Sequence, residues 1–387
     1  MAEELSYVIV TPYSIRKSRT GGIIARLISR TGLDIVGARM FAPSRELTEK
    51  YASTIVTDPE PRHRATQQLI KEYVLKNFQP DSAGHKPRVL VLVFRGDDAV
   101  LKIRGVVGHI VNERTSGETI RDTYGDYVAD KTGKVTYFEP AVLAPPDAAS
   151  AAENLKLWAS YSDQDGGLLD DAIDFAPSSS VQKTLVLIKP DNFRFPNARP
   201  GGVIDLFSRT GLYIIGFKVH RMSVAQAEEF YRPVLDVLMD KLREPSGIRA
   251  RLAFEREFGF PLTEDVQRRL GDLLGPLAGR EHWESIVKFM SGIKPSECPA
   301  DRRNDPGTEK CIALVYQGID AVRKIREVLG PTDPSKAPPG SIRREYGSTI
   351  MVNAAHASDS PENAEREMKI VQIEENNFKP LIEAHFA

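Results

Sequence analysis

The second half of the chain alternates apolar runs with amphipathic stretches, a pattern that predicts interleaved strands and helices. The apolar runs that predict strands lie at 184–189, 212–221 and 312–317. The periodic stretches that predict helices lie at 202–210, from Ser223 onward, at 283–290 and at 320–329. Ser223 and Gln226 form a capping-box sequence, and we expect one more short strand just before His356.

Elements in the order β-α-β-β-α-β, joined by long connections, favour an antiparallel sheet covered by helices on one face. We therefore predict a ferredoxin-like α+β sandwich. The glycine pairs do not form G-x-G-x-x-G after a strand, and G-x-x-x-x-G-K-[ST] is absent, which excludes Rossmann and P-loop folds. Any phosphate chemistry must then work without a P-loop lysine.

The same pattern is present twice, because R-T-G-L-D-I-V-G at 30–37 recurs as R-T-G-L-Y-I-I-G at 209–216. Later matches, such as 96–104 with 318–326, have an offset of 222 residues instead of 179, so the second copy carries 43 additional residues. Most of them lie at about 232–279, where the charged, helical periodicity predicts inserted helices. The sequence thus predicts two tandem ferredoxin-like domains, at 1–160 and 181–387, joined by a linker at 161–180.

Composition narrows the possible partners and location. The 52 Lys and Arg nearly balance the 53 Asp and Glu, so no overall charge attracts nucleic acid or an anionic membrane. No apolar run approaches the roughly 20 residues of a membrane span, and no apolar leader indicates secretion. With only two cysteines, Cys298 and Cys311, we expect a cytoplasmic protein; their pairing across a loop stays open.

The candidate chemistry of the second copy centres on N-A-A-H-A-S-D-S at 353–360. Small neighbours leave room for the imidazole of His356 to meet a ligand, and Ser360 with Pro361 signals a helix start. A histidine in this setting is a possible phosphate acceptor.

Several polar side chains of the same copy could hold a phosphorylated ligand. The phosphate candidates are Lys189 at a strand end, Arg326 on an amphipathic helix, Thr332 in the following loop, and Arg343; Asn353 could bond a sugar hydroxyl. Each alone is most often a surface or structural residue. Together they supply the positive charge that phosphoryl transfer requires around the equatorial oxygens.

The second copy resembles nucleoside diphosphate kinase across nearly its full span. The family's K-P-D is present at 189–191, its glycine-initiated helix at 201–204 as G-G-V-I, and its P-G-T-I-R at 339–343 as P-G-S-I-R. Its N-x-x-H-G-S-D-S is present at 353–360 with a single change, Ala357 for glycine. The resemblance implies ping-pong transfer of a γ-phosphoryl group from a nucleoside triphosphate to a nucleoside diphosphate, with Mg²⁺.

The resemblance also implies roles for individual residues. His356 is the nucleophile, Glu367 orients it with Ser358 nearby, and Tyr231 lies beside it. The phosphates are held by Lys189, Arg326, Thr332 and Arg343, and the ribose by Asn353 and Lys189. Mg²⁺ is carried by the nucleotide's phosphates and reached by Asp359 at most through water.

Two departures from the family concern the base and the motif asparagine. His282 takes the place of the phenylalanine that stacks on the base, although its imidazole or the neighbouring Trp283 can still stack. Met351-Val352 replaces the family's Gly-Arg.

The first copy keeps the scaffold matches but not the reactive residues. Thr11 takes the place of Lys189, and A-P-P-D at 144–147 matches the histidine segment with Ala144 in the histidine's place. Arg104 and Arg121 remain, matching the two arginines of the second copy. We interpret this copy as a degenerate, attached partner that forms a pseudo-dimer with the catalytic copy, within a homo-oligomer.

Three functions stay open at this point. The first is nucleoside diphosphate kinase activity through a phosphohistidine at His356. The second is a non-catalytic nucleotide-binding or regulatory scaffold in which the insertion blocks transfer. The third is a phosphohistidine relay that passes the group to a protein. The intact set of second-copy residues favours the first.

Overall fold

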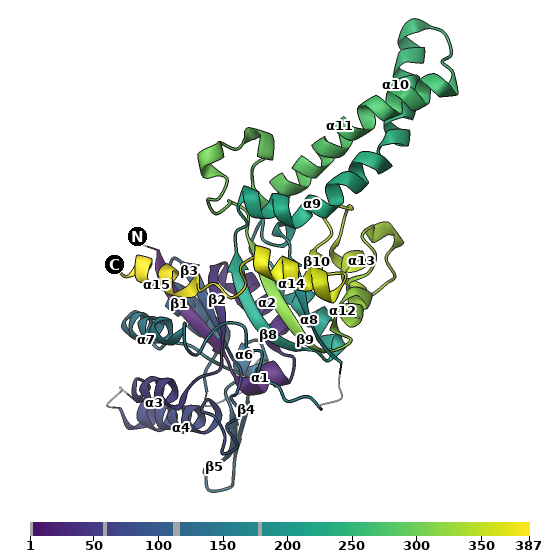
Figure 1. Cartoon of the computed structure of the whole chain (residues 1–387). Coiled ribbons are helices and arrows are strands. Elements are labelled where there is room, and N and C mark those ends of the chain that lie inside the picture. Colours follow the sequence, from purple (N-terminus) through teal and green to yellow (C-terminus); the bar gives the residue numbers. More distant parts are fainter. Residues whose placement is uncertain (1–2, 57–59, 111–116, 177–179) are drawn as a thin grey trace. The chain divides into compact units, whose positions relative to one another are not determined.

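The computed structural model describes residues 3–56, 60–110, 117–176 and 180–387 (Figure 1). It divides into two compact units, residues 1–219 with 312–387, and His220–Cys311. The first unit contains the sheets of both copies, and the second contains the inserted helices. The sequence segment 177–179, part of the expected linker, lies outside the described residues. Within the described ranges, every helix is too short or too polar to cross a membrane.

The first copy forms a four-stranded antiparallel sheet with strand order β2-β3-β1-β6. Its strands are β1 (Glu4–Val10), β2 (Asp34–Phe41), β3 (Val89–Gly96) and β6 (Val142–Leu143). Its helices are α1 (Pro12–Arg16), α2 (Thr20–Thr31), α3 (Arg45–Ser53), α4 (Pro61–Asn77), α5 (Ala99–Val107), α6 (Ile120–Tyr124) and α7 (Ala148–Tyr161). A separate hairpin of β4 (Asp126–Ala129) and β5 (Val135–Glu139) precedes β6.

The second copy forms a sheet of the same design, with strand order β8-β9-β7-β10. Its strands are β7 (Val181–Ile188), β8 (Tyr213–His220), β9 (Cys311–Ile319) and β10 (Ala355–Ala357). Its helices in the first unit are α8 (Arg199–Phe207), α12 (Ala321–Leu329), α13 (Ile342–Tyr346), α14 (Pro361–Ile370) and α15 (Phe378–His385). The two antiparallel sheets with their helices confirm the predicted tandem α+β fold.

Local signals in the sequence give most element boundaries correctly. The capping box of Ser223 and Gln226 is present, with both reciprocal hydrogen bonds, at the start of the predicted helix. Ser360 caps α14 and Pro361 occupies its first turn, as predicted. We expected the last strand to lie before His356, but β10 (Ala355–Ala357) includes the histidine itself. Its three residues are specified by pairing with β7, which a local pattern does not reveal.

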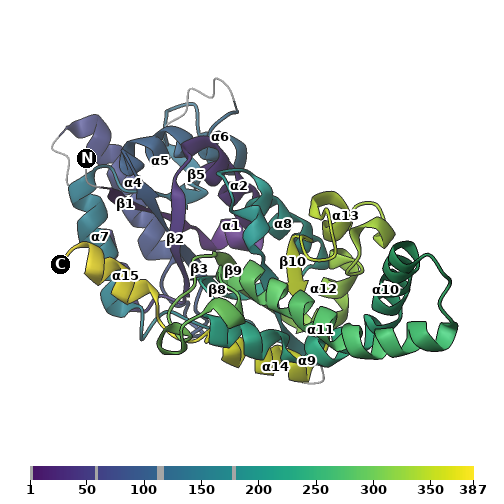
Figure 2. The same cartoon turned by 90° about the horizontal axis from the view of Figure 1, so that it is seen from above.

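Helices α2 and α8, one from each copy, lie side by side in the first unit (Figure 2). A Cβ added at Gly21 would lie 2.6 Å from the carbonyl oxygen of Gly201, and one added at Gly201 would lie 2.3 Å from that of Gly21. The two backbones therefore touch where the family-like glycine pairs occur. A side chain at either position would force the helices apart.

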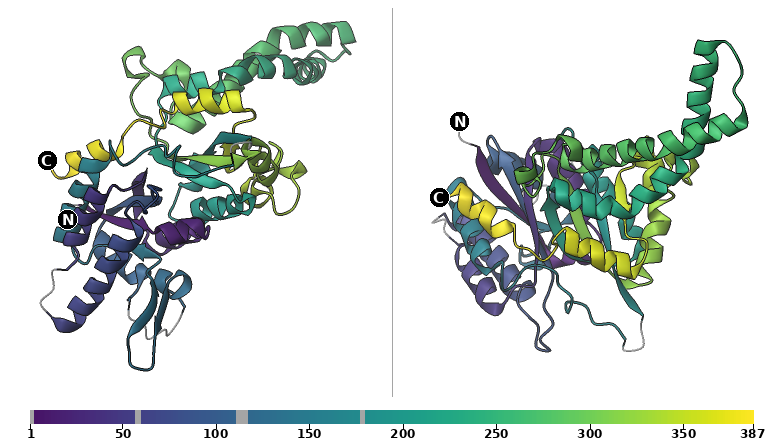
Figure 3. Two further views of the ribbon diagram at one scale, coloured as in Figure 1. Left: turned by 60° about the horizontal axis from the view of Figure 1, so that its bottom comes forward. Right: turned by 45° about the horizontal axis from the view of Figure 1, so that its top comes forward.

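The C-terminal helix also packs onto the first copy, and the expected linker contacts the second copy. The C-terminal helix α15 packs beside α7 of the first copy (Figure 3). The ring of Phe378 lies 5.7 Å from that of Phe41 in the first copy's core. Lys379 Nζ lies 3.0 Å from the carboxylate of Asp163. In the other direction, the backbone N–H of Leu169 donates to the carbonyl of Ile215 in β8 at 2.9 Å. The chain thus fastens its two copies to each other at both ends.

The second unit is built on three helices, α9 (Val224–Lys241), α10 (Arg243–Phe258) and α11 (Glu264–Ser291). Both α9 and α10 pack along α11, which confirms the inserted helices that periodicity predicts. Glycines spaced four residues apart on α11 allow this close approach. Cβ atoms added at Gly271, Gly275 and Gly279 would lie 2.6, 2.6 and 2.4 Å from backbone atoms of Arg243, Arg243 and Met239.

Candidate active site

The histidine is positioned by a strand and the helix that follows it. His356 lies in β10 opposite Leu187 of β7, and its side chain is 23% exposed. Ser360 and Pro361 start α14 directly after the strand, so Glu367 comes two turns into that helix. The buried carboxylate of Glu367 thereby faces back toward the imidazole, as its hydrogen bonds show.

Glu367 is shared between His356 and Ser358. His356 Nε2 lies 2.9 Å from Glu367 Oε2, and the hydroxyl of Ser358 donates to the same oxygen at 2.7 Å. Arg366 lies 3.6 Å from the other carboxylate oxygen. An ionised carboxylate only accepts, so this arrangement places the ring proton on Nε2 and the ring's lone pair on Nδ1.

Lys189 follows the last residue of β7 and is buried beneath the histidine motif. Its ammonium donates to the carbonyl of Met351 at 2.7 Å and to Oδ1 of Asn353 at 2.9 Å. Burial lowers the pKa of Lys189 to about 8; Asp191 acts to raise it, and Arg343 acts to lower it further. An anion bound here would stabilise the charged form of the lysine.

Asn353 connects the histidine motif to the loop after α12. Its side-chain amide donates to the carbonyl of Ile350 at 2.8 Å and to that of Thr332 at 3.1 Å. Thr332 itself is exposed, so its hydroxyl faces solvent at the edge of this group. The asparagine therefore holds Lys189 on one side and the threonine loop on the other.

The two arginines of the second copy differ in their surroundings. Arg343 is half-buried and donates to the carbonyl of Gly330 at 3.0 Å and to that of Ala355 at 3.2 Å. Arg326 is exposed on α12, whose opposite face is buried as predicted. Its guanidinium makes no hydrogen bond or ion pair with any residue in the described ranges. Arg326 thus has its full binding capacity available for a ligand.

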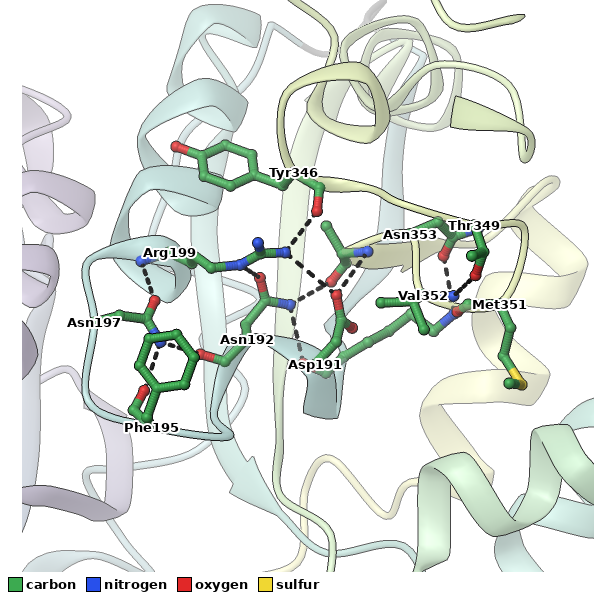
Figure 4. Close-up of polar contacts among 12 residues, drawn as sticks. Asp191, Asn192, Phe195, Asn197, Arg199, Tyr346, Thr349, Met351, Val352 and Asn353 are labelled. Atoms are coloured by element: carbon green, nitrogen blue, oxygen red, sulfur yellow. Dashed lines mark hydrogen bonds and ion pairs between the residues drawn. The ribbon is translucent and has the colours of Figure 1, made fainter. Parts of the chain in front are cut away.

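A polar network of Asp191, Asn192 and Arg199 supports the turn before His356 (Figure 4). The sequence alone predicts no role for these residues. Ala354 has a left-handed backbone (φ 71°), and its N–H donates to Asp191 Oδ2 at 3.3 Å. Asn192 donates to the carbonyl of Ala354 at 2.8 Å, and Arg199 lies 3.5 Å from Asp191. Burial raises the pKa of the Asp191 carboxyl, while Lys189 and Arg199 act to lower it. The only sequence signal for this network is the position of Asp191 in K-P-D.

Tyr231 and His282 belong to the second unit. Tyr231 is buried; its ring lies 5.1 Å from that of Phe230, and its carbonyl accepts from Trp283 Nε1 at 2.9 Å. His282 is exposed on α11. Trp283 is 5% exposed, so almost none of its ring is available to a base and the stacking role considered for it is wrong.

Asp359 is exposed, and one of its carboxylate oxygens accepts from the side-chain amide of Asn363 at 2.6 Å. No cluster of three or more His, Cys, Asp or Glu suited to a metal ion occurs in the part of the chain that the structure describes. A single accessible carboxylate fits Mg²⁺ that is held mainly by a ligand's phosphates, since Mg²⁺ commonly takes one or two protein carboxylates in such sites.

The sequence model described as nucleoside diphosphate kinase matches residues 4–159 and 305–376, more than half of the chain. The chain belongs to the nucleoside diphosphate kinase family. This is a family of phosphotransferases. The split match is consistent with two tandem nucleoside diphosphate kinase-like segments.

Individual nucleoside diphosphate kinases match between about a third and half of the chain. That of Staphylothermus marinus is 29% identical over 192 residues, covering 50% of this chain and 93% of its own. That of Streptomyces avermitilis is 35% identical over 140 residues, covering 33% of this chain and 90% of its own. The crystal structure of an NDP kinase from Pyrobaculum aerophilum has 27% identity over 49% of this chain and 94% of its own, with a TM-score of 0.31.

The strand register corrects one expectation about the first nucleoside diphosphate kinase-like copy. Leu143 lies opposite Ile9 in β1, as His356 lies opposite Leu187 in β7. The expectation that Ala144 takes the histidine's place is therefore wrong by one residue. The error arises because the two segments share few residues: two prolines follow Ala144, and the second copy has none at the matching positions.

Proposed function

We propose that this chain is an active nucleoside diphosphate kinase and that His356 carries the phosphoryl group between substrates. The observation that supports this most strongly is the contact of Nε2 with the buried Glu367, which leaves Nδ1 as the nucleophilic nitrogen. Nδ1 attacks the γ-phosphorus of a nucleoside triphosphate, a nitrogen–phosphorus bond forms, and the bond to the bridging oxygen breaks. The nucleoside diphosphate leaves with that oxygen's electron pair.

The second half-reaction reverses the first. A terminal β-phosphate oxygen of another nucleoside diphosphate attacks the phosphohistidine, a new nucleoside triphosphate forms, and the imidazole regains its lone pair. During both steps Glu367 keeps the ring oriented and stabilises the positive charge that develops on it when Nδ1 is phosphorylated. Ser358 holds the carboxylate in place from its other side.

Cationic and hydroxyl groups around the histidine would bind the nucleotide. We assign the phosphates to Arg326, Arg343 and Thr332, and the ribose hydroxyls to Lys189 and Asn353. When Mg²⁺ is bound to the nucleotide it neutralises phosphate charge, and Asp359 would reach it at most through water.

We also propose the domain division expected from the repeat, with the degenerate copy at 1–160, a linker at 161–180 and the catalytic copy at 181–387. The glycine contact of α2 with α8 and the exchanged terminal segments support a pseudo-dimer within one chain. Nucleotide substrates agree with a cytoplasmic location and with a homo-oligomer typical of such metabolic enzymes.

The deciding experiment uses the full chain and ATP labelled in the γ-phosphate. We expect acid-labile label on the wild type, discharged to GTP when GDP is added. Absence of label would overturn the enzyme proposal and favour the regulatory scaffold, whereas label that GDP does not remove would favour the protein-directed relay. His356→Ala serves as the matched negative control.

A further inference from the structure

The arm, residues 234–279 of α9, α10 and α11, exposes an unusual number of large apolar side chains. Ten of the seventeen exposed large hydrophobic residues in the described ranges lie in it. They are Val234, Val237, Ile248, Leu252, Phe254, Phe258, Phe260, Leu273, Leu274 and Leu277. Leu273 and Leu277 are 69% and 64% exposed. Single exposed apolar residues are normal on a protein surface, but a cluster of them in one region indicates an interaction surface.

What the arm buries makes this exposure more informative. Its fully buried residues in the described structure are Leu235 and four glycines at 247, 271, 275 and 279, while its other apolar side chains are half-buried or exposed. The helices are therefore joined by close backbone contact and gain little apolar burial from each other. In proteins most of the stability of a helix comes from the packing of an apolar face and not from helix propensity. A partner that covers the exposed face would supply that packing.

The spacing of the exposed residues on α11 is that of a helix-pairing surface. Val266, Leu270, Leu273 and Leu277 follow one another at intervals of four, three and four residues, the heptad spacing of a helical seam. Val266 and Leu270 are half-buried, so the exposed part of this seam lies toward Leu277. Three aromatic rings cluster near the turn between α10 and α11. The ring of Phe258 lies 5.9 Å from that of Phe254 and 6.1 Å from that of Phe260.

The charges of the arm indicate what kind of partner would fit. Residues 234–279 contain seven Lys and Arg and eight Asp and Glu, interspersed along the helices. Several already pair within the arm, such as Arg243 with Asp272 at 2.8 Å and Arg269 with Asp265 at 2.8 Å. A balanced surface has no net attraction for nucleic acid or an anionic membrane, and it does not repel an identical surface related by a two-fold axis.

We propose that the arm binds the arm of a second copy of this chain, forming a helical bundle closed by Leu273 and Leu277. Helical hairpins associate in this way through apolar faces. Ten such side chains at about half exposure present roughly 900 Å² of surface per arm in total, and a standard interface buries ~800 Å² per partner, so the proposal requires most of them to face the second arm. The inserted helices thus serve as a dimerisation device, separate from the proposed transfer reaction.

The test measures the mass of the full chain by sedimentation velocity. We expect the species formed by the wild type to lose half its mass in the double variant Leu273→Glu/Leu277→Glu. The matched control is Leu101→Glu, because Leu101 is 70% exposed in the first copy, outside the arm, and its change should leave the mass unaltered. Circular dichroism checks that each variant is folded.

Four results would overturn the proposal. Three concern mass: a wild-type monomer of 43.0 kDa, a double variant with unchanged mass, and loss of assembly in the Leu101→Glu control. The fourth is a monomeric wild type that binds anionic vesicles, with this binding abolished in the double variant. If the double variant does not fold, spin labels on Leu273→Cys in a Cys298→Ser background decide the question. Pairing of arms predicts a defined distance between labels on two chains, and its absence overturns the proposal.

Discussion

The two copies build the same turn before the last strand of their sheets and place different side chains after it. Ala141 and Ala354 both have a left-handed backbone, with φ of 61° and 71°. Two residues later the first copy has Leu143, fully buried, and the second has His356, part exposed. The turn is therefore a property of the fold. Its presence in the first copy shows that the scaffold does not depend on a histidine at this position.

The residue that faces the histidine changes together with it. Asp147 caps α7 as Ser360 caps α14, and seven residues later the first copy has Asn154 where the second has Glu367. Asn154 accepts from Thr54 at 2.8 Å within the buried core of its own copy. An imidazole–carboxylate pair is thus replaced by an apolar residue and an amide that serves local packing.

In contrast to the histidine and its carboxylate, one arginine makes the same contacts in both copies. Arg121 donates to the carbonyls of Gly108 and Val142, and Arg343 to the equivalent carbonyls of Gly330 and Ala355. Burial lowers the pKa of Arg121 to about 10. The same contacts persist where the counterparts of His356 and Glu367 are Leu143 and Asn154, so holding this loop to the last strand is a structural task in both copies.

The largest effect is expected when the second copy is given the first copy's residue. His356→Leu should abolish labelling and transfer, because no nitrogen remains to accept the phosphoryl group. The melting temperature should stay within a few degrees of the wild type, since Leu143 fills the equivalent position in a folded copy. Phosphate labelling and thermal unfolding measure the two quantities. A variant that retains transfer would remove His356 from the mechanism.

The next largest effect separates the two arginines. Arg343→Ala should slow transfer by on the order of a hundredfold or more, as for loss of a preorganised charge. Arg121→Ala should leave kcat and KM nearly unchanged but lower the free energy of unfolding by about 1–3 kcal/mol through its lost hydrogen bonds. Steady-state kinetics with urea unfolding compare the pair. A strong kinetic effect of Arg121→Ala would mean that the first copy takes part in turnover.

Glu367→Gln should lower kcat by at least about tenfold, because a neutral amide no longer stabilises the positive ring or fixes its tautomer. KM should change little, since the carboxylate contacts His356 and Ser358 and no residue assigned to the nucleotide. The matched control is Asn154→Gln in the first copy, which should leave kcat unaltered. An equal rise in KM would indicate that the substitution disturbs the whole site.

The smallest effect concerns the pH dependence of Lys189. Burial lowers the pKa of Lys189 to about 8, so its ammonium loses its charge above that pH. The KM for nucleotide should therefore rise several-fold between pH 7.5 and 9.5, a range that includes this pKa. Lys189→Arg should flatten this rise, since arginine stays charged. A KM of the wild type that is constant across this range would contradict the assignment.

The same shift has a consequence for stability. Between about pH 8 and the ordinary lysine pKa, the unfolded chain binds a proton that the folded chain does not. The contribution of Lys189 to the free energy of unfolding therefore increases as pH rises through this window. Lys189→Met should remove that increment, which urea titrations at several pH values would detect.

The sequence alone determined the features that depend on a few neighbouring residues. The repeat, the order of strands and helices, the inserted helices and the caps of Ser223 and Ser360 all follow from local spacing and composition. The histidine motif also marks its own helix start. Family resemblance then indicated which polar residues to group around it, including Glu367 eleven residues later.

The tertiary structure decided the features that depend on distant residues meeting. Strand pairing, not sequence matching, identified Leu143 as the counterpart of His356. Contact between α2 and α8 revealed why both copies need their glycines, and the folded turn revealed what Asp191 binds. Register, helix contact and burial arise from residues far apart in the chain, so their physical origin is the packing of the whole copy and no local pattern encodes them.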